Sequence, residues 1–152
     1  MKIAIGADHA GFDLKEKIKQ RLLQEGHEVH DKGTHSTESV DYPDFARLVG
    51  EEVGKNEAEF GVLVCGSGIG MSIAANKVPG VRAAHVTNMY EAQMAREHNN
   101  ANVVTVGARV LDEWTAIQAI EKFLHTAFAG GRHERRVQKI MAIEQQEEPH
   151  HA

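Results

Sequence analysis

Short apolar runs alternate with longer amphipathic segments along almost the whole chain, and this alternation restricts the fold more than any other feature. Strands that are separated by helices pair in parallel through right-handed crossovers, so helices cover both faces of the sheet. We therefore expect an α/β fold, a three-layer sandwich with a five-stranded parallel sheet and a C-terminal helix. The expected strands are residues 2–7, 27–33, 60–65, 80–86 and 101–109. The expected helices are residues 12–26, 44–56, 71–77, 88–100, 112–128 and 132–146.

Local signals support these boundaries. Pro43 lies near the start of the second helical segment, and Asp112 is placed to cap the fifth. The first helical segment has one apolar face, formed by Leu14, Ile18 and Leu22. The last segment has an apolar side formed by Val137, Ile140, Met141 and Ile143. Each helix is thus expected to pack on the sheet or on a neighbouring helix.

Length and composition narrow the class of protein. A chain of 152 residues suits one domain, which we place at 1–146, followed by a flexible tail at 147–152. The net charge of −5 argues against general nucleic-acid binding. The single cysteine cannot form an internal disulfide, and no apolar segment has the length to span a membrane. We expect a cytoplasmic protein that binds neither nucleic acid nor membrane.

The stretch "GVLVCGSGIGMS" carries the strongest chemical signal. It places Cys65 at the end of a buried strand, directly before a loop that contains Gly66, Gly68 and Gly70. Such a loop exposes backbone N–H groups that form a cradle for an anion, and Ser67 adds a hydroxyl. The adjoining helix dipole favours a thiolate, so Cys65 is a candidate base or nucleophile. The alternative is that Cys65 is an inert, buried apolar residue.

The loop does not match the better-known glycine motifs. Its G-x-G-x-G spacing differs from the dinucleotide fingerprint, and no lysine completes a P-loop. Cys65 stands where a G-x-S-x-G elbow requires its first glycine. The papain-type signature needs a second cysteine and an aromatic residue, which are missing. No H-E-x-x-H or clustered Cys/His spacing indicates a metal, so we expect neither metal nor cofactor.

Further polar residues stand at positions that suit a site. Asp8 and His9 follow the first strand, at the sheet edge where ligands bind in such folds; the alternative is that Asp8 caps the next helix. His98 and Asn99 close a helix and have the alternative of a polar C-terminal cap.

Two arginines of the last helix suit a phosphate clamp. Arg132 and Arg136 are four residues apart and share a helix face, whereas Arg135 points elsewhere. The alternative is an ordinary solvated charged face.

Seven segments together resemble one family. In chain order they are "GADHAGF", "DKGT", "DYPDFA", "CGSGIGMSIAANKVPGVRAA", "REHNNANV", "GARV" and "GGRHERRV". Their order and extent, from Lys2 to about Glu144, are similar to type B ribose-5-phosphate isomerases, within the sugar-phosphate isomerases that include galactose-6-phosphate and allose-6-phosphate enzymes. This resemblance implies a Rossmann-like sandwich, a phosphorylated sugar as substrate, metal-free aldose–ketose isomerisation, and a homodimer that is sometimes paired into tetramers.

The resemblance also implies roles for individual residues. Cys65 resembles the base that moves a proton between C1 and C2, His98 the acid that opens the sugar ring, and Asp8 a helper in proton movement. The loop that stabilises the enediolate corresponds to Gly66, Ser67, Gly68, Ile69 and Gly70. The phosphate ligands correspond to His9, Arg132 and Arg136. Further substrate contacts correspond to Tyr42, Asn99 and Arg109. In the family some of these residues, including His98 and Asn99, reach in from the second subunit.

One position points to a branch within the family. Some members use a glutamate base four residues after the loop serine, and here that position is Met71. The chain therefore resembles the cysteine-based branch. Two alternatives stay open: the same reaction on allose 6-phosphate, galactose 6-phosphate or a tetrulose phosphate, or a non-catalytic module that binds sugar phosphates.

Overall fold

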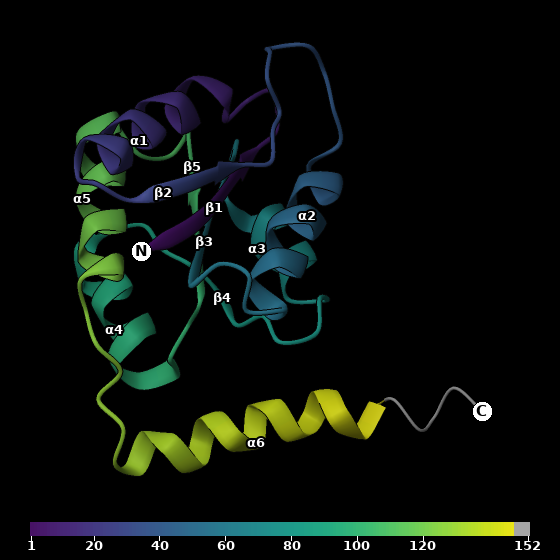
Figure 1. Cartoon of the computed structure of the whole chain (residues 1–152), viewed down its shortest axis with the longest axis vertical. Coiled ribbons are helices and arrows are strands. Elements are labelled where there is room, and N and C mark those ends of the chain that lie inside the picture. The colour runs from purple at the N-terminus through teal and green to yellow at the C-terminus, as the bar shows by residue number, and fades with distance from the viewer. Residues whose placement is uncertain (148–152) are drawn as a thin grey trace.

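Five parallel strands form one sheet in the order β2-β1-β3-β5-β4, seen edge-on in the centre of Figure 1. The structure is a computed structural model that describes residues 1–147. The strands are β1 (Lys2–Ala7), β2 (Glu28–Asp31), β3 (Phe60–Cys65), β4 (Ala83–His85) and β5 (Val103–Gly107). The predicted parallel sheet of five strands is confirmed.

Helices cover both faces of the sheet, as predicted. Three of them, α1 (Phe12–Gln24), α4 (Met89–Asn99) and α5 (Glu113–Leu124), lie on one face. Two others, α2 (Tyr42–Gly54) and α3 (Ile69–Ala75), lie on the opposite face. The last helix, α6 (Arg132–Glu147), runs across one end of the molecule (Figure 1). Among the described helices, none combines the length and the hydropathy that crossing a membrane requires.

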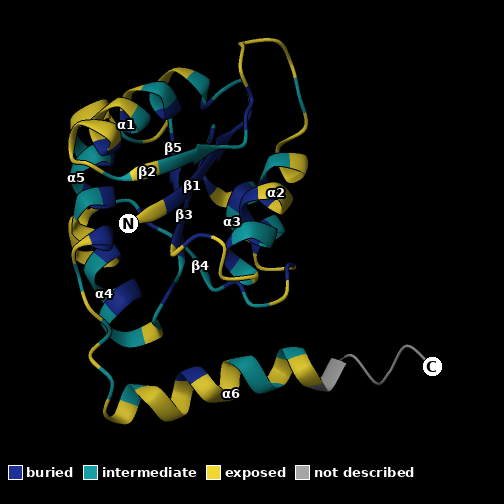
Figure 2. Ribbon diagram, in the orientation of Figure 1, coloured by how far each residue is buried: buried dark blue, intermediate teal, exposed yellow. Residues whose placement is uncertain are grey.

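The alternation of side chains along each strand produces two separate cores, because successive residues point to opposite faces. In β3, Val62 and Val64 pack with α1, α4 and α5, whereas Leu63 and Cys65 pack with α2 and α3. Every residue of β3 is buried (Figure 2). Cys65 therefore ends a strand that is covered on both faces.

The fourth strand is shorter than the expected 80–86. The side chain of Asn102 accepts a hydrogen bond from the Arg82 N–H (2.8 Å) and donates one to the Gly80 carbonyl (2.9 Å). These side-chain bonds satisfy backbone groups that a longer strand would have paired with β5. The prediction of a strand from residue 80 was wrong for this reason.

The predicted helix starts are confirmed at two positions. Pro43 lies in the first turn of α2, and the Asp112 carboxylate accepts a hydrogen bond from the Thr115 N–H at 2.7 Å. The third helix begins at Ile69, two residues before the expected start. These starts place the loops before α2 and α3 at the same edge of the sheet.

The expected apolar side of α6 is covered only in part. Val137 is buried, but Ile140 and Ile143 are 44% and 61% exposed. The helix touches α4 rather than the sheet, and it leaves much of this side uncovered within one chain. Of the tail expected at 147–152, only Glu147 lies within the described residues.

Candidate active site

The carboxyl ends of β1, β3 and β5 are neighbours in the sheet, and the loops that follow them meet around a pocket of about 600 Å³. The residues that line it are Asp8, Tyr42, Cys65, Gly66, Ser67, Ile69, Gly70, Ile73, Arg109 and Val110. Eight of these ten are residues that the sequence singled out. The pocket lies where ligands of open parallel sheets bind, at the carboxyl ends of the strands.

The glycine loop has a backbone that only glycine suits at its centre. Gly68 adopts φ +83°, and a Cβ at this residue would lie 2.7 Å from the His85 ring. The Thr105 hydroxyl donates a hydrogen bond to the Gly68 carbonyl at 2.9 Å and so holds the loop against β5. Gly68 N–H is thereby directed back to Cys65, where it donates to Sγ at 3.2 Å.

The Cys65 side chain is 4% exposed, is not in a disulfide, and borders both the α2/α3 core and the pocket. The sulfur accepts the hydrogen bond from Gly68 N–H, so a backbone donor of the loop is directed at it. The interpretation of Cys65 as inert packing does not account for this donor or for the pocket beside the sulfur.

Two amide groups of the loop remain available for a ligand. The Cys65 and Gly66 carbonyls accept hydrogen bonds from the Ala108 and Arg109 N–H groups, both at 2.9 Å. In a trans peptide the carbonyl of one residue and the N–H of the next point in opposite directions. Because the Cys65 and Gly66 carbonyls face the turn after β5, the Gly66 and Ser67 N–H groups point away from it. Neither N–H donates a hydrogen bond to any residue within 1–147. Such paired donors suit an oxygen that becomes negative during a reaction.

Asp8 and His9 follow β1, as the sequence indicated. The Asp8 carboxylate is buried and accepts a hydrogen bond from the Gly11 N–H at 3.0 Å. Gly11 is itself the N-cap of α1, so Asp8 closes the preceding turn, and its interpretation as the helix cap was wrong. His9 Nδ1 accepts from the Val40 N–H at 3.1 Å, which leaves the proton of a neutral ring on Nε2.

The rim of the pocket combines an aromatic ring, a cation and apolar side chains. The Tyr42 ring lies against Gly70, where an added Cβ would approach it to 2.6 Å, and Arg109 lies above Gly66. Ile73 and Val110 also line the pocket, and they were not predicted from the sequence. Their side chains are 61% and 57% exposed. The sequence did contain a signal for Ile73. It lies four residues after Ile69, so the two side chains share one face of α3, next to the glycine loop.

The other predicted residues do not line this pocket. His98 and Asn99 end α4 at the amino edge of the sheet, opposite to Cys65 across the length of β3, which is about 17 Å. The Ala129 N–H donates to the Glu97 carbonyl and attaches the start of α6, with Arg132 and Arg136, to this same end.

These residues form a cluster of their own. The His98 and His133 rings stack with centroids 4.3 Å apart. Desolvation lowers the pKa of His133, and the nearby His98, Arg132 and Arg136 lower it further. Arg132 and Arg136 therefore supply the positive charge of this cluster, as an anion-binding surface requires.

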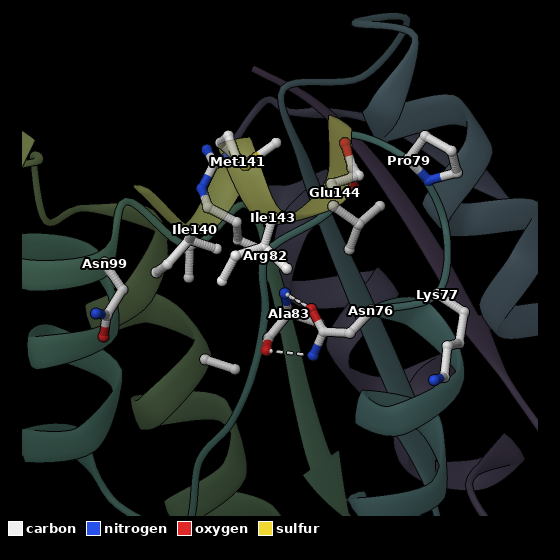
Figure 3. Close-up of a pocket in the computed structure, with 13 residues that line it drawn as sticks. Asn76, Lys77, Pro79, Arg82, Ala83, Asn99, Ile140, Met141, Ile143 and Glu144 are labelled. Carbon is white, nitrogen blue, oxygen red and sulfur yellow. Dashed lines mark hydrogen bonds between the residues drawn. The ribbon is translucent and has the colours of Figure 1, made fainter. Parts of the chain in front are cut away.

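A larger cavity, of about 910 Å³, lies between α6 and the amino edge of the sheet (Figure 3). Arg82, at its centre, donates to the Asn100 carbonyl at 2.9 Å, and the Glu144 carboxylate accepts from the Gly80 N–H. Arg82 and Glu144 are thus engaged, and Ile140 and Ile143 make much of its wall apolar. The pocket at Cys65 places a thiol beside free loop amides, so it is the better candidate for chemistry.

Comparison with known proteins identifies the family. The sequence model described as "Ribose/Galactose Isomerase" matches residues 3–140. Ribose-5-phosphate isomerase B of Escherichia coli is 46% identical over 144 residues, which cover 95% of this chain and 97% of that protein. The solved structure of the Clostridium thermocellum ribose-5-phosphate isomerase B has a TM-score of 0.95 and 51% identity, and covers 96% and 99% of the two chains.

A third relative was solved with a sugar phosphate in place. The Mycoplasma genitalium ribose-5-phosphate isomerase B, with bound ribulose-5-phosphate, is 42% identical with a TM-score of 0.92, over 95% of this chain and 96% of that one. The resemblance seen in the sequence motifs is confirmed, as is the Rossmann-like fold that it implied. The chain is therefore a member of the ribose/galactose isomerase family and is similar to its type B ribose-5-phosphate isomerases.

Proposed function

We propose that this protein interconverts ribose 5-phosphate and ribulose 5-phosphate by moving a proton between C1 and C2, with Cys65 as the base. The observation that carries the proposal is the Cys65 Sγ, which accepts a hydrogen bond from Gly68 N–H. It lies in a pocket beside two loop amides that have no partner within residues 1–147. The relatives named for this reaction support the substrate class, and one of them holds ribulose-5-phosphate.

In the proposed reaction the thiolate removes the C2 proton of the open-chain aldose, and the electron pair forms an enediolate. The same thiol returns the proton to C1, while a proton moves from O2 to O1, which yields the ketose. The Gly66 and Ser67 N–H groups and the Ser67 hydroxyl stabilise the enediolate oxygens. Asp8, at the pocket wall, assists the transfer between the oxygens.

The ring-opening acid and the phosphate ligands come, in this proposal, from a second copy of the chain. His98, Asn99, Arg132 and Arg136 belong to the family's site by resemblance, yet they lie at the opposite edge of the sheet from Cys65. Only another copy brings them to this pocket, so the enzyme acts as a homodimer with shared sites. His9 Nε2 and Arg109 complete the contacts from the copy that supplies Cys65.

Binding of the remote phosphate holds C1 and C2 against the sulfur, so part of the binding energy lowers the barrier. Each step uses groups of the chain alone, and chelators are expected to leave turnover unchanged. A reducing cytoplasm would keep Cys65 as a free thiol.

The decisive experiment compares kcat/KM for four-, five- and six-carbon sugar phosphates. We expect ribose 5-phosphate to exceed erythrose 4-phosphate, allose 6-phosphate and galactose 6-phosphate by at least about tenfold, roughly the discrimination that a missing or extra carbon allows. A six-carbon or four-carbon sugar as the best substrate would retain the reaction but overturn the substrate. Binding without turnover of any of them would leave a sugar-phosphate-binding module instead.

A further inference from the structure

A second cluster of ligating side chains lies at the amino edge of the sheet, remote from the pocket at Cys65. Glu25 follows the last residue of α1, His27 precedes β2, and His125 follows α5. One potential ligand atom from each of the three residues lies within 4.8 Å of the other two. The two imidazole rings are 6.4 Å apart between centroids. The fold thus brings together residues that are separated by about a hundred positions.

Polar atoms of this cluster are buried without a partner. Within residues 1–147, three buried side-chain atoms lack a hydrogen bond, and two of them are His27 Nε2 and Glu121 Oε1. The Arg21 Nε approaches Glu121 Oε1 to 3.6 Å, which is too long for a hydrogen bond. A buried polar atom without a partner is unfavourable. His27 Nε2, which belongs to the cluster of possible ligand atoms, is therefore a buried nitrogen that a ligand could satisfy.

The local charge favours a cation. Glu25 and Glu121 both face the cluster. Of the neighbouring cations, Arg21 is half exposed, and the Met1 amino group lies 3.2 Å from His27 Nδ1. Helices α1 and α5 both end here, and each C-terminus carries partial negative charge.

We propose that Glu25, His27 and His125 bind a zinc ion. Two imidazole nitrogens and one carboxylate oxygen are a donor set that Zn²⁺ accepts, with water as the fourth ligand. Tetrahedral zinc with bonds of about 2.0–2.2 Å holds its ligand atoms about 3.3 Å apart. The ligand atoms lie within 4.8 Å of one another, so the exposed side chains of Glu25 and His125 rotate inward to reach this spacing when zinc binds.

The hydrogen bonds around the two rings assign the ligating nitrogens. His125 Nε2 lies 3.2 Å from Glu121 Oε2, so Nδ1 faces the metal and Glu121 orients the ring from outside, as carboxylates do in many zinc sites. The Met1 amino group lies 3.2 Å from His27 Nδ1, which leaves the unpartnered Nε2 for the metal. When zinc binds Nε2, one of the protons held by the Met1 amino group and the His27 ring is released to solvent.

The proposed zinc ties the ends of α1 and α5 to the start of β2 and has no part in the reaction. It therefore stands apart from the proposed function. Because zinc binds the folded cluster and not the separated residues of the unfolded chain, it is expected to raise Tm.

Calorimetric titration of the full, chelator-treated chain with ZnCl₂ tests this inference. We expect one zinc per chain, and we expect His27→Gln and His125→Gln each to lower the affinity at least about tenfold and to abolish the rise in Tm. Glu121→Gln is expected to lower the affinity by about 10- to 100-fold, as loss of an orienting carboxylate does.

Two control variants separate this site from other ligands of zinc in the chain. The double variant His150→Gln/His151→Gln and the variant Cys65→Ser are expected to bind zinc as the wild type does. The inference is overturned if either histidine variant of the cluster binds zinc with unchanged affinity, or if binding disappears in either control variant. Isomerase activity is expected to be equal with and without zinc, so a failure here leaves the proposed function untouched.

Discussion

Cys65 occupies a position where a small apolar residue would meet the packing demands. Its side chain is 4% exposed and belongs to the same apolar cluster as Met71. Packing alone gives no reason for a donor aimed at the sulfur, yet Gly68 N–H lies 3.2 Å from it. A thiolate uses that donor, and the adjoining pocket gives it access to a substrate.

We expect Cys65→Ala to abolish isomerisation, with a fall in kcat of at least about 10³-fold, because the reaction loses its base. The fold and the binding of sugar phosphate should persist, which circular dichroism and calorimetry would measure. The matched control is Met71→Leu, a change of similar volume in the same cluster that should leave kcat within a few-fold. Substantial turnover in Cys65→Ala would remove the sulfur from its role.

Lys15 is a fully buried cation between α1 and β2. Its ammonium donates to Asp31 Oδ1 at 2.8 Å and to the Thr34 carbonyl at 2.6 Å. It anchors the segment that leads from β2 towards Tyr42, and so connects the interior with the rim of the pocket. Without Lys15, Asp31 keeps only the partly exposed Lys19 (3.0 Å) as an ion-pair partner, and the buried Thr34 carbonyl loses its donor.

Lys15→Met is therefore expected to lower the free energy of unfolding by about 3–5 kcal/mol. Urea denaturation followed by circular dichroism would measure the change. The control is Lys17→Met, since Lys17 is 57% exposed and its contact with Glu113 (3.4 Å) contributes less than about 1 kcal/mol. Equal stability of the two variants would show that the Lys15 pair contributes nothing.

Asp31 makes the stability of the fold depend on pH. Burial alone would raise the pKa of its carboxyl, but hydrogen bonds from Lys15, Gly33 and Lys19 outweigh burial and hold the pKa below its ordinary value. A depressed pKa contributes stability that is present above pH about 4 and is lost as the pH falls through the folded-state value. Tm measured from pH 6 to pH 2 should fall less steeply in Asp31→Asn than in the wild type. Parallel curves would contradict this assignment.

At the scale of elements, α6 presents charge at its start and apolar side chains beyond. Arg132 and Arg136 lie beside the stacked rings of His98 and His133, whereas Ile140 and Ile143 are exposed. A helix with an uncovered apolar side and a cationic first turn suits contact with another copy of the chain and with a phosphate.

Arg136→Ala is expected to raise KM for ribose 5-phosphate by roughly 10- to 100-fold, the loss of a charge-assisted hydrogen bond, with a smaller effect on kcat. Steady-state kinetics would measure both constants. Arg135→Ala removes the same charge from another face of the helix and should change KM less than about threefold. An unchanged KM in Arg136→Ala would place the phosphate ligand elsewhere.

At the scale of the whole molecule, the two halves of the proposed site lie at opposite edges of one sheet. Cys65 ends β3, and His98 lies near the end of α4, beside the start of β5. Neither half forms a complete site within one chain. If the homodimer shares its sites, two inactive variants can restore activity when they pair, which a site within one chain would not allow.

Cys65→Ala and His98→Ala should each be inactive, and refolding an equal mixture should restore activity to about a quarter of the wild-type value. Random pairing makes half of the dimers mixed, and each mixed dimer has one intact site of two. The assay is turnover of ribose 5-phosphate, and each variant refolded alone is the control. No recovery in the mixture would mean that Cys65 and His98 do not share a site.

Much of the fold and most of the residues that line the pocket were readable from the sequence. The alternation of apolar runs with amphipathic segments predicted the sheet, because side-chain periodicity is a local property. Most of the residues that meet at the pocket follow β1, β3 and β5, as expected for a parallel sheet. The shortening of β4 was not readable, since it depends on Asn102, which is distant in sequence from Gly80.

By itself, the sequence determined the layered fold, the family and the place of Cys65 at the end of a buried strand. These follow from local patterns and from motifs in fixed order. Only the tertiary structure decided that His98, Arg132 and Arg136 lie away from Cys65, and that Glu25, His27 and His125 meet. The physical reason is that helix direction and chain crossover set which ends of distant elements coincide, and spacing along the chain does not encode that distance.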